Sequence, residues 1–403
     1  MTQFQIPVQI APVIYTEEQM KLIEPQLDEL ISQCNELIER ASKTVEAASD
    51  CCLQAAGAEK LLTQPLKLQN RVHEASFAVK QLKRKAGLLP PHPQFKFKSG
   101  HCTILGKRPT NEDAHVMENF EHEGRNYTLT AVFDGHAGDA AAKYCAQHFK
   151  KQLISQDSFN AQPIKAMKQA FVEMDADFCA ISQMSGCTAT AMLFEHGAEN
   201  TLLTANAGDA RIIFRANDQL QAATIDHKPS SPGEKARVEA AGSFVTTIFG
   251  VARVAGQLLV AVSRAIGDYD YKQFGVTAEP ETYSYTDLDD LKYVVCACDG
   301  LYDVLSNEEI DYAVMSALNA AGAPNGRQQI IGDAMKLYIN GKTREGDELL
   351  MKNANSCFVN FMACVEPKME FSFEQRIATA LTRIAYLLGS MDNITAIVLV
   401  ASE

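Results

Sequence analysis

The chain has 403 residues and a formal net charge of −13, enough for one large domain or two to three ordinary ones. The acidic balance argues against nucleic acid or an anionic membrane as the main partner, and no apolar stretch reaches the roughly 20 residues that span a bilayer. The eleven cysteines show no C-x-x-C pair and no zinc spacing, and the N-terminus lacks a signal-peptide pattern. These features predict a reduced intracellular protein of the cytoplasm, the nucleus or both.

Residues 1–93 are expected to form a helical extension that ends in a proline-rich linker. Apolar residues recur three and four apart from Met20 to Val45, and again from Val72 to Ala86, which is the spacing of amphipathic helices. The run LLPPHP at 88–93 cannot continue a helix. Two interpretations stay open, a helical extension packed on the main domain or a helical hairpin that binds a partner or self-associates.

From residue 94 onward, short strands are mixed with helices. The segment 201–214 (TLLTANAGDARIIF) predicts a hairpin with a tight turn at Gly208-Asp209. Long helices together with antiparallel strands indicate sheets covered by helix layers. The other expected strands are 127–133, 258–262, the run ending at Asp299 and 394–400, and the expected helices are 140–153, 163–181, 235–241 and 308–321.

Carboxylates stand at the ends of apolar runs or in turns at widely separated places. AVFDGHAG ends a strand at Asp134, VVCACDG ends another at Asp299, and GSMDNIT places Asp392 just before the last strand. RPTNEDA adds Glu112 and Asp113. Any single Asp-Gly pair also fits an ordinary turn, but the recurrence favours a site for a hard divalent cation such as Mg²⁺ or Mn²⁺, which prefers oxygen ligands.

The motifs, taken in order, resemble the metal-dependent Ser/Thr protein phosphatases of type 2C over roughly residues 95–400. The resemblance implies an α+β fold, a four-layer α-β-β-α sandwich of two antiparallel sheets flanked by helices. It also implies a catalytic domain over 94–403, with a flap near 228–255 and an insertion near 323–368. The matching motifs are RPTNEDA, VFDGHAG, SGCTATAML, ANAGDAR, DHKP, EKARVEAAGSFV, AGQLLVAVSRAIGD, ACDGLYDVLSNEE and GSMDNITAIVLV.

The same resemblance implies a ligand set for two Mg²⁺ or Mn²⁺ ions. Asp134, Asp299 and Asp392 would ligate one ion. Glu112, Asp134 and the carbonyl of Gly135 would hold the other, with Asp134 bridging the two.

Further roles follow from the resemblance. Asp113 would lie behind Glu112, Arg108 would grip the substrate phosphate with its planar fork, and His136 would be the general acid. Asp209 and Asp303 match positions associated with a weaker third metal site, although a plain turn role fits Asp209 nearly as well.

The implied function is hydrolysis of phosphoserine and phosphothreonine in phosphoprotein substrates, a signalling activity. A hydroxide bridging the two ions would attack phosphorus in line, without a covalent phosphoenzyme. Arg108 would stabilise the developing charge, and His136 would protonate the departing oxygen. The alternative is a catalytically inactive scaffold or regulatory binding module of the same fold, which the complete ligand set disfavours.

Some positions depart from the family pattern. Ala137 stands where glycine is usual, and a positive φ at this position would strain its backbone. Tyr302 stands where tryptophan is common and is expected to fill the same core space. The insertion over 323–368 fits either an added helix or loop packed on the core, or an element that selects substrates or partners.

Overall fold

The computed structural model describes residues 91–402, apart from 182–184, 198, 256–258, 325 and 354–363, together with the single positions Pro25, Lys80 and Arg84. The chain divides into two compact units, residues 1–91 and 92–403. Apart from these three single positions, the helices expected within 1–93 lie outside the described residues. The second unit contains every element discussed below.

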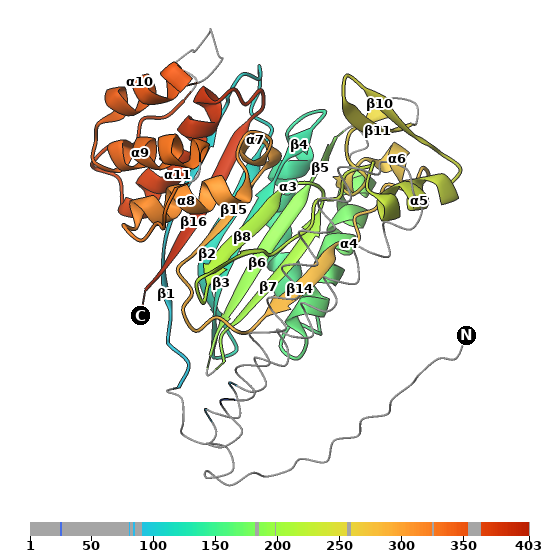
Figure 1. The fold of residues 1–403 in the computed structure, drawn as a ribbon. Helices are drawn as coiled ribbons and strands as arrows, with labels where there is room; N and C mark the ends of the chain where they lie inside the picture. The colour runs from blue at the N-terminus through green and yellow to red at the C-terminus, as the bar shows by residue number, and fades with distance from the viewer. Residues whose placement is uncertain are drawn as a thin grey trace. The chain divides into compact units, whose positions relative to one another are not determined.

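Two five-stranded antiparallel sheets form the centre of this unit (Figure 1). The strand order of the first sheet is β1-β16-β15-β8-β9, and that of the second is β14-β7-β6-β3-β2. The first sheet contains β1 (Lys96–Ile104), β16 (Ile394–Ser402), β15 (Tyr293–Ala297), β8 (Arg211–Ala216) and β9 (Gln219–Ala222). The second contains β14 (Glu281–Tyr285), β7 (Thr201–Ala207), β6 (Ala189–His196), β3 (Arg125–Phe133) and β2 (Ala114–His122).

Successive side chains along each central strand point to opposite faces of the sheet and so contribute to two different apolar layers. In β15, Val294 and Cys296 join the cluster between the sheets, while Tyr293 and Val295 join the cluster beneath the helices on the other face. Both faces of these strands are buried, which is why their sequences read as continuous apolar runs. The result is a core in three layers, one between the sheets and one under each helix layer.

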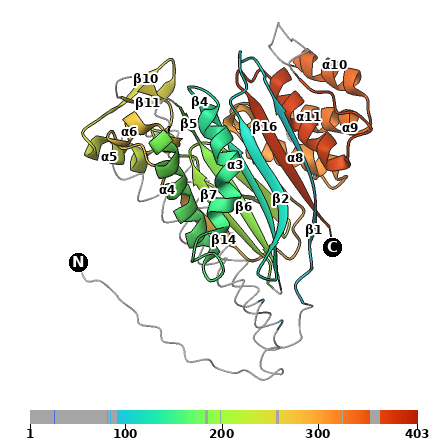
Figure 2. The ribbon, with the colours of Figure 1, turned by 180° about the vertical axis from the view of Figure 1, so that it is seen from behind.

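Helices cover both outer faces, so the predicted four-layer sandwich is confirmed (Figures 1 and 2). The second sheet is covered by α3 (Ala140–Ile154) and α4 (Pro163–Ile181). The first sheet is covered by α8 (Asn307–Ala317), α9 (Arg327–Ile339) and α11 (Phe373–Leu387), with α10 (Thr343–Asn353) beside them.

The predicted hairpin over 201–214 is wrong. β7 pairs with β6 and β14, whereas β8 pairs with β15 and β9 in the other sheet. The tight turn exists, with Gly208 at φ +127°, but it carries the chain across the sandwich. The apolar pattern could not reveal this, because a strand with two buried faces fits either sheet. The helix expected over 308–321 also ends early, at Ala317.

Described residues of the segment 323–368 form the helices α9 and α10, which pack against the core. Arg383 of α11 is buried, and its guanidinium donates to both carboxylate oxygens of Asp347 in α10, at 2.7 and 2.6 Å. The hydroxyl of Tyr338 in α9 donates to the same carboxylate at 2.9 Å. This buried ion pair joins α9, α10 and α11.

A flap projects beside the second sheet and has its own small apolar cluster around Val238 and Val254. It comprises α5 (Pro232–Ala240), β10 (Val245–Ile248), β11 (Val251–Ala255) and β12 (Leu259–Val260). Next to it lie the short strands β4 (Gly135–His136), β5 (Gly186–Cys187) and β13 (Ile266–Gly267), and the single turn α6 (Tyr269–Lys272).

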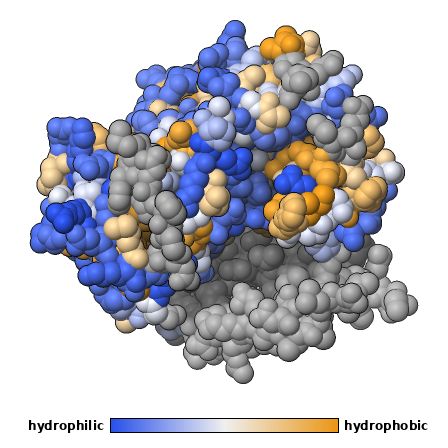
Figure 3. All heavy atoms as spheres, turned by 90° about the horizontal axis from the view of Figure 1, so that it is seen from above, coloured by the Kyte–Doolittle hydropathy of each residue, from blue (hydrophilic) through white to orange (hydrophobic). Residues whose placement is uncertain are grey.

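The flap exposes apolar side chains, including Phe244 and a fully exposed Phe249. Figure 3, which views the molecule from above, shows hydrophobic side chains gathered on the flap side of this face. Within the described ranges, no helix has the length and apolar character needed to cross a membrane.

Candidate metal centre

The acidic residues singled out in the sequence meet at one end of the sandwich, the upper end in Figure 1 where β4 and α7 (Asp299–Tyr302) lie. Asp134 directly follows β3, and Asp299 begins α7 just after β15. Asp392 lies in the loop before β16, and Glu112 and Asp113 directly precede β2. Four strands from two sheets thus deliver these carboxylates to one place.

The glycines after two of these aspartates permit a close approach of backbones. A Cβ on Gly135 would lie 2.3 Å from the carbonyl oxygen of Glu112, and one on Gly300 would lie 2.0 Å from the carbonyl oxygen of Asn393. No side chain fits at either position. The Asp-Gly pairs therefore bring distant acidic segments into contact, besides turning the chain.

Asn393 ties the loop that carries Glu112 to the segment that carries Asp392. Its side-chain amide donates to the carbonyls of Leu105 and Thr110, at 2.9 and 2.8 Å, and its side-chain oxygen accepts from the Glu112 amide at 2.9 Å. Asn393 is not among the residues predicted from the sequence, although it lies inside GSMDNIT. The amino-acid type gave no signal, because its partners are backbone groups almost 300 positions away.

The side chain of Glu112 is held at both oxygens. One accepts from the hydroxyl of Thr110 and the other from the backbone amide of Gly138, each at 3.1 Å. Asp113 accepts a 2.6 Å hydrogen bond from the hydroxyl of Thr395. These contacts fix the orientation of both carboxyls.

The carboxylates of the cluster repel one another, and burial disfavours their charged forms. Burial, followed by the nearby charges of Asp299 and Asp113, raises the pKa of Asp134 well above its usual value. Burial and the charges of Asp209 and Asp303 do the same to the pKa of Asp299. Burial raises the pKa of Asp113 to about 6, although its bond to Thr395 opposes the shift.

Two oxygens of this cluster are buried without a hydrogen-bond partner among the described residues, Oδ1 of Asp113 and Oδ1 of Asp299. Buried acceptors of this kind are costly unless something binds them. An oxygen-only donor set with unpartnered acceptors and excess negative charge fits a hard divalent cation. The residues present therefore suit the metal chemistry that the sequence predicts.

Cys298 lies within the same group, with its sulfur, Asp113 and Asp134 mutually within 4.8 Å. Burial raises the pKa of this thiol well above its usual value, and the sulfur accepts from the Thr395 amide at 3.1 Å. A neutral, already bonded thiol is a poor ligand for Mg²⁺ or Mn²⁺. Its contacts fit a packing role.

The charge of Lys228 acts on two further acids, Asp209 and Asp303. Burial raises the pKa of Asp209 to about 6, opposed by the charge of Lys228. The ammonium of Lys228 also lies 3.9 Å from a carboxylate oxygen of Asp303, which is exposed at the end of α7. A flap lysine therefore partly neutralises this outer pair.

Arg108 reaches over the rim of the site. Its guanidinium donates to Oδ2 of Asp392 at 2.5 Å, and about half of its side chain is exposed. One edge of the planar fork thus points at an acid of the cluster while much of the group stays open to solvent. A phosphate approaching from solvent would meet a cation already held beside the acids.

His136 lies in β4 with its Nε2 2.7 Å from Oδ2 of Asp268. Burial would lower the pKa of this histidine, but the charge and hydrogen bond of Asp268 raise it above its usual value. The next residue, Ala137, has φ +55°, so its backbone lies in the left-handed region that strains a residue other than glycine. Tyr302 is buried as expected, and the Arg211 guanidinium stacks on its ring.

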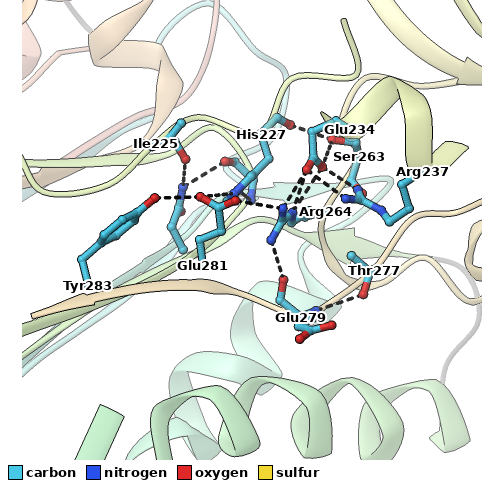
Figure 4. Close-up of polar contacts among 12 residues, drawn as sticks. Ile225, His227, Glu234, Arg237, Ser263, Arg264, Thr277, Glu279, Glu281 and Tyr283 are labelled. Atoms are coloured by element: carbon cyan, nitrogen blue, oxygen red, sulfur yellow. Dashed lines mark hydrogen bonds and ion pairs between the residues drawn. The ribbon is translucent and has the colours of Figure 1, made fainter. Parts of the chain in front are cut away.

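The flap is anchored through Glu234, which is almost fully buried (Figure 4). Its carboxylate accepts from Arg237, Ser263 and Arg264 at 2.5–3.2 Å. Burial opposes its charge, but these donors lower the pKa of Glu234 well below its usual value. Both arginines line a cavity of about 460 Å³, where they already neutralise acids.

An acid-rich end on a two-sheet, helix-covered sandwich suits a protein that binds divalent metal ions. The family model described as Protein phosphatase 2C matches residues 97–336. The chain belongs to the protein phosphatase 2C family.

Individual relatives agree with this assignment. The chain is 33% identical over 250 residues to Protein phosphatase 1B of Mus musculus, covering 55% of this chain and 62% of the mouse protein. It is 37% identical over 229 residues to Protein phosphatase 2C homolog 2 of Schizosaccharomyces pombe, covering 52% and 60%. The chain thus spans about three fifths of the length of these two relatives.

Solved structures share the fold. A serine-threonine phosphatase 2C from Toxoplasma gondii superposes with a TM-score of 0.57 at 18% identity, covering 78% of this chain and 98% of that one. A sex determining protein of C. elegans gives a TM-score of 0.53 at 20% identity, covering 85% and 74%. At these identities the likeness concerns the fold alone.

Proposed function

We propose that this chain removes phosphate from phosphoserine and phosphothreonine residues of proteins by metal-dependent hydrolysis. The observation that carries the proposal is the meeting of Glu112, Asp134, Asp299 and Asp392 with Arg108 and His136 at one end of the sandwich. Residues 94–403 would carry the activity, and residues 1–93 would bind a partner or pack on the catalytic domain.

The proposed ligands are acids of the cluster and one carbonyl. Asp134, Asp299 and Asp392 would hold one divalent ion, and Glu112, Asp134 and the carbonyl of Gly135 a second. Mg²⁺ or Mn²⁺ bound there would neutralise the clustered acids and supply a water activated at neutral pH. Asp209 and Asp303 would support a weaker third ion, and Asp113 would support the first two by positioning Glu112.

The remaining residues of the chain would bind the substrate and move protons. Arg108 would hold two phosphoryl oxygens with its planar fork, since its exposed edge faces solvent at the rim. His136 would give a proton to the seryl or threonyl oxygen as it departs, a step that contributes roughly 10²- to 10⁴-fold to the rate.

The direct test is release of phosphate from a phosphothreonine peptide by the full chain. We expect release with Mn²⁺ or Mg²⁺, and none after addition of EDTA. The Arg108→Ala variant is expected to raise KM strongly, and Arg344→Ala, which alters an almost fully exposed arginine of α10, serves as the control. A folded protein that binds Mn²⁺ yet releases no phosphate would instead support the inactive scaffold.

A further inference from the structure

Asp268 is a buried acid that no role above uses, and it directly faces the proposed general acid. Its side chain is about 6% exposed, and its Oδ2 lies 2.7 Å from Nε2 of His136. The two residues are 132 positions apart. Since a carboxylate only accepts hydrogen bonds, Nε2 of His136 carries the hydrogen of this bond.

The local fold is built around this contact. β5 is the centre of the small sheet, where Gly186 pairs with His136 on one side and with Gly267 on the other. A Cβ on Gly186 would lie 2.5 Å from the carboxyl carbon of Asp268. Only glycine at this position leaves room for the Asp268 carboxylate to reach across β5 to the imidazole.

The backbone of Asp268 is also unusual. Its φ is +52°, in the left-handed region that costs most residues free energy, and its amide donates to the carbonyl of Ser185 at 3.2 Å. The left-handed backbone of Asp268, the absence of a side chain at Gly186 and the burial of the Asp268 carboxylate all support the contact with His136. The imidazole itself is about 30% exposed, so without Asp268 its ring could rotate.

We propose that Asp268 is a positioning residue that holds Nε2 of His136, so that Nδ1 of the same ring faces the departing oxygen of the substrate. The inference rests on the proposed phosphatase function. As the bond between phosphorus and the seryl or threonyl oxygen breaks, the electron pair leaves with that oxygen, which takes the proton from Nδ1. The attacking water ends as a hydroxyl on the released phosphate, its second proton goes to solvent, and His136 regains a proton from solvent.

Leaving-group dependence separates this role from a structural one. A phosphothreonine peptide has an alcohol leaving group that needs a proton, whereas the p-nitrophenolate of p-nitrophenyl phosphate departs without one. We expect Asp268→Asn to lower kcat on the peptide by about 10- to 100-fold, as loss of a ligand-orienting partner typically does. With p-nitrophenyl phosphate the change should stay within about threefold, because proton donation contributes little there.

Asparagine is isosteric and tolerates the left-handed region, so the backbone of the Asp268→Asn variant should persist. Asp270→Asn, an exposed acid two residues further on, is the matched control and should leave both rates unchanged. His136→Gln should show the same selectivity as Asp268→Asn, and the double variant should be no slower than His136→Gln alone.

A second variant guards against misfolding. Asp268→Gly suits φ +52° and leaves space for a small carboxylate, so added formate should restore peptide hydrolysis several-fold without changing p-nitrophenyl phosphate hydrolysis. Equal losses on both substrates, or a peptide rate in Asp268→Asn equal to the wild-type rate, would overturn the proposal. Failure of the phosphatase function itself would look different, because wild-type protein with Mn²⁺ would then release no phosphate.

Discussion

The strained backbone at Ala137 gives a stability prediction with a defined sign. Ala137 has φ +55° and an exposed side chain, so Ala137→Gly removes a methyl group that makes little packing contribution. The left-handed region costs a non-glycine residue about 1–2 kcal/mol. Glycine gives back about 0.5–1 kcal/mol of this through the larger conformational entropy of the unfolded chain. We therefore expect a net stabilisation of about 0.5–1 kcal/mol.

The matched control is Ala176→Gly, at an exposed position inside α4 where the backbone is helical. There the same chemical change should destabilise the protein by about 1 kcal/mol. Denaturant unfolding of the metal-free protein, followed by circular dichroism, measures both differences. Because a folded unit of this size has a large unfolding entropy, the melting temperature should rise by about 1 °C for Ala137→Gly and fall by about 1.5 °C for Ala176→Gly. Equal destabilisation by both variants would refute the argument, because it would mean that Ala137 pays no conformational cost.

Three further predictions concern charged groups. Asp299→Ala should abolish metal-dependent phosphate release. It should leave the circular dichroism spectrum of the metal-free protein intact, since it removes one of several mutually repelling acids. Undiminished turnover would contradict the ligand assignment. Burial raises the pKa of Asp113 from 3.8 to about 6, so the folded state favours the protonated carboxyl. The stability that this carboxyl contributes to the metal-free protein is complete below about pH 4, where it is protonated, and is lost as the pH rises through about 6. The melting temperature of wild type relative to Asp113→Asn should therefore fall across this window, and a rise would be the wrong sign. Arg383→Met should lower the free energy of unfolding by about 3–5 kcal/mol, because it leaves the Asp347 carboxylate buried without its cation. The double variant Arg383→Met with Asp347→Leu should recover much of that loss in denaturant unfolding. A double variant no more stable than Arg383→Met would argue against this account.

Much of the fold could be predicted because its signals are local. The helix 163–181 has the predicted bounds, and the strand expected at 127–133 forms the buried part of β3. The pairing of strands is not local. Thr201–Phe214 satisfies every rule for a hairpin, yet its halves belong to different sheets, since the choice depends on packing against β6 and β15.

In the candidate site, too, local patterns could be predicted from the sequence and non-local contacts could not. Asp134 and Asp299 could be found because acid at the end of an apolar run is a visible pattern. Asn393 could not, because its function is to bond the backbone carbonyls of Leu105 and Thr110. Any polar residue type at that position would have looked equally plausible in the sequence.

The contact between His136 and Asp268 shows most clearly where sequence reasoning ends. Both residues lie in motifs that support the family resemblance, VFDGHAG and SRAIGD, yet nothing in either motif indicates that they meet. They meet because β5 pairs with both β4 and β13, and because Gly186 has no side chain to separate them. If Asp268 orients His136, Gly186 supports catalysis indirectly, because its missing side chain leaves room for the Asp268 carboxylate. Gly186→Ala should then reduce peptide hydrolysis with the same leaving-group selectivity as Asp268→Asn, whereas a loss shared equally by p-nitrophenyl phosphate would show that the glycine serves only packing.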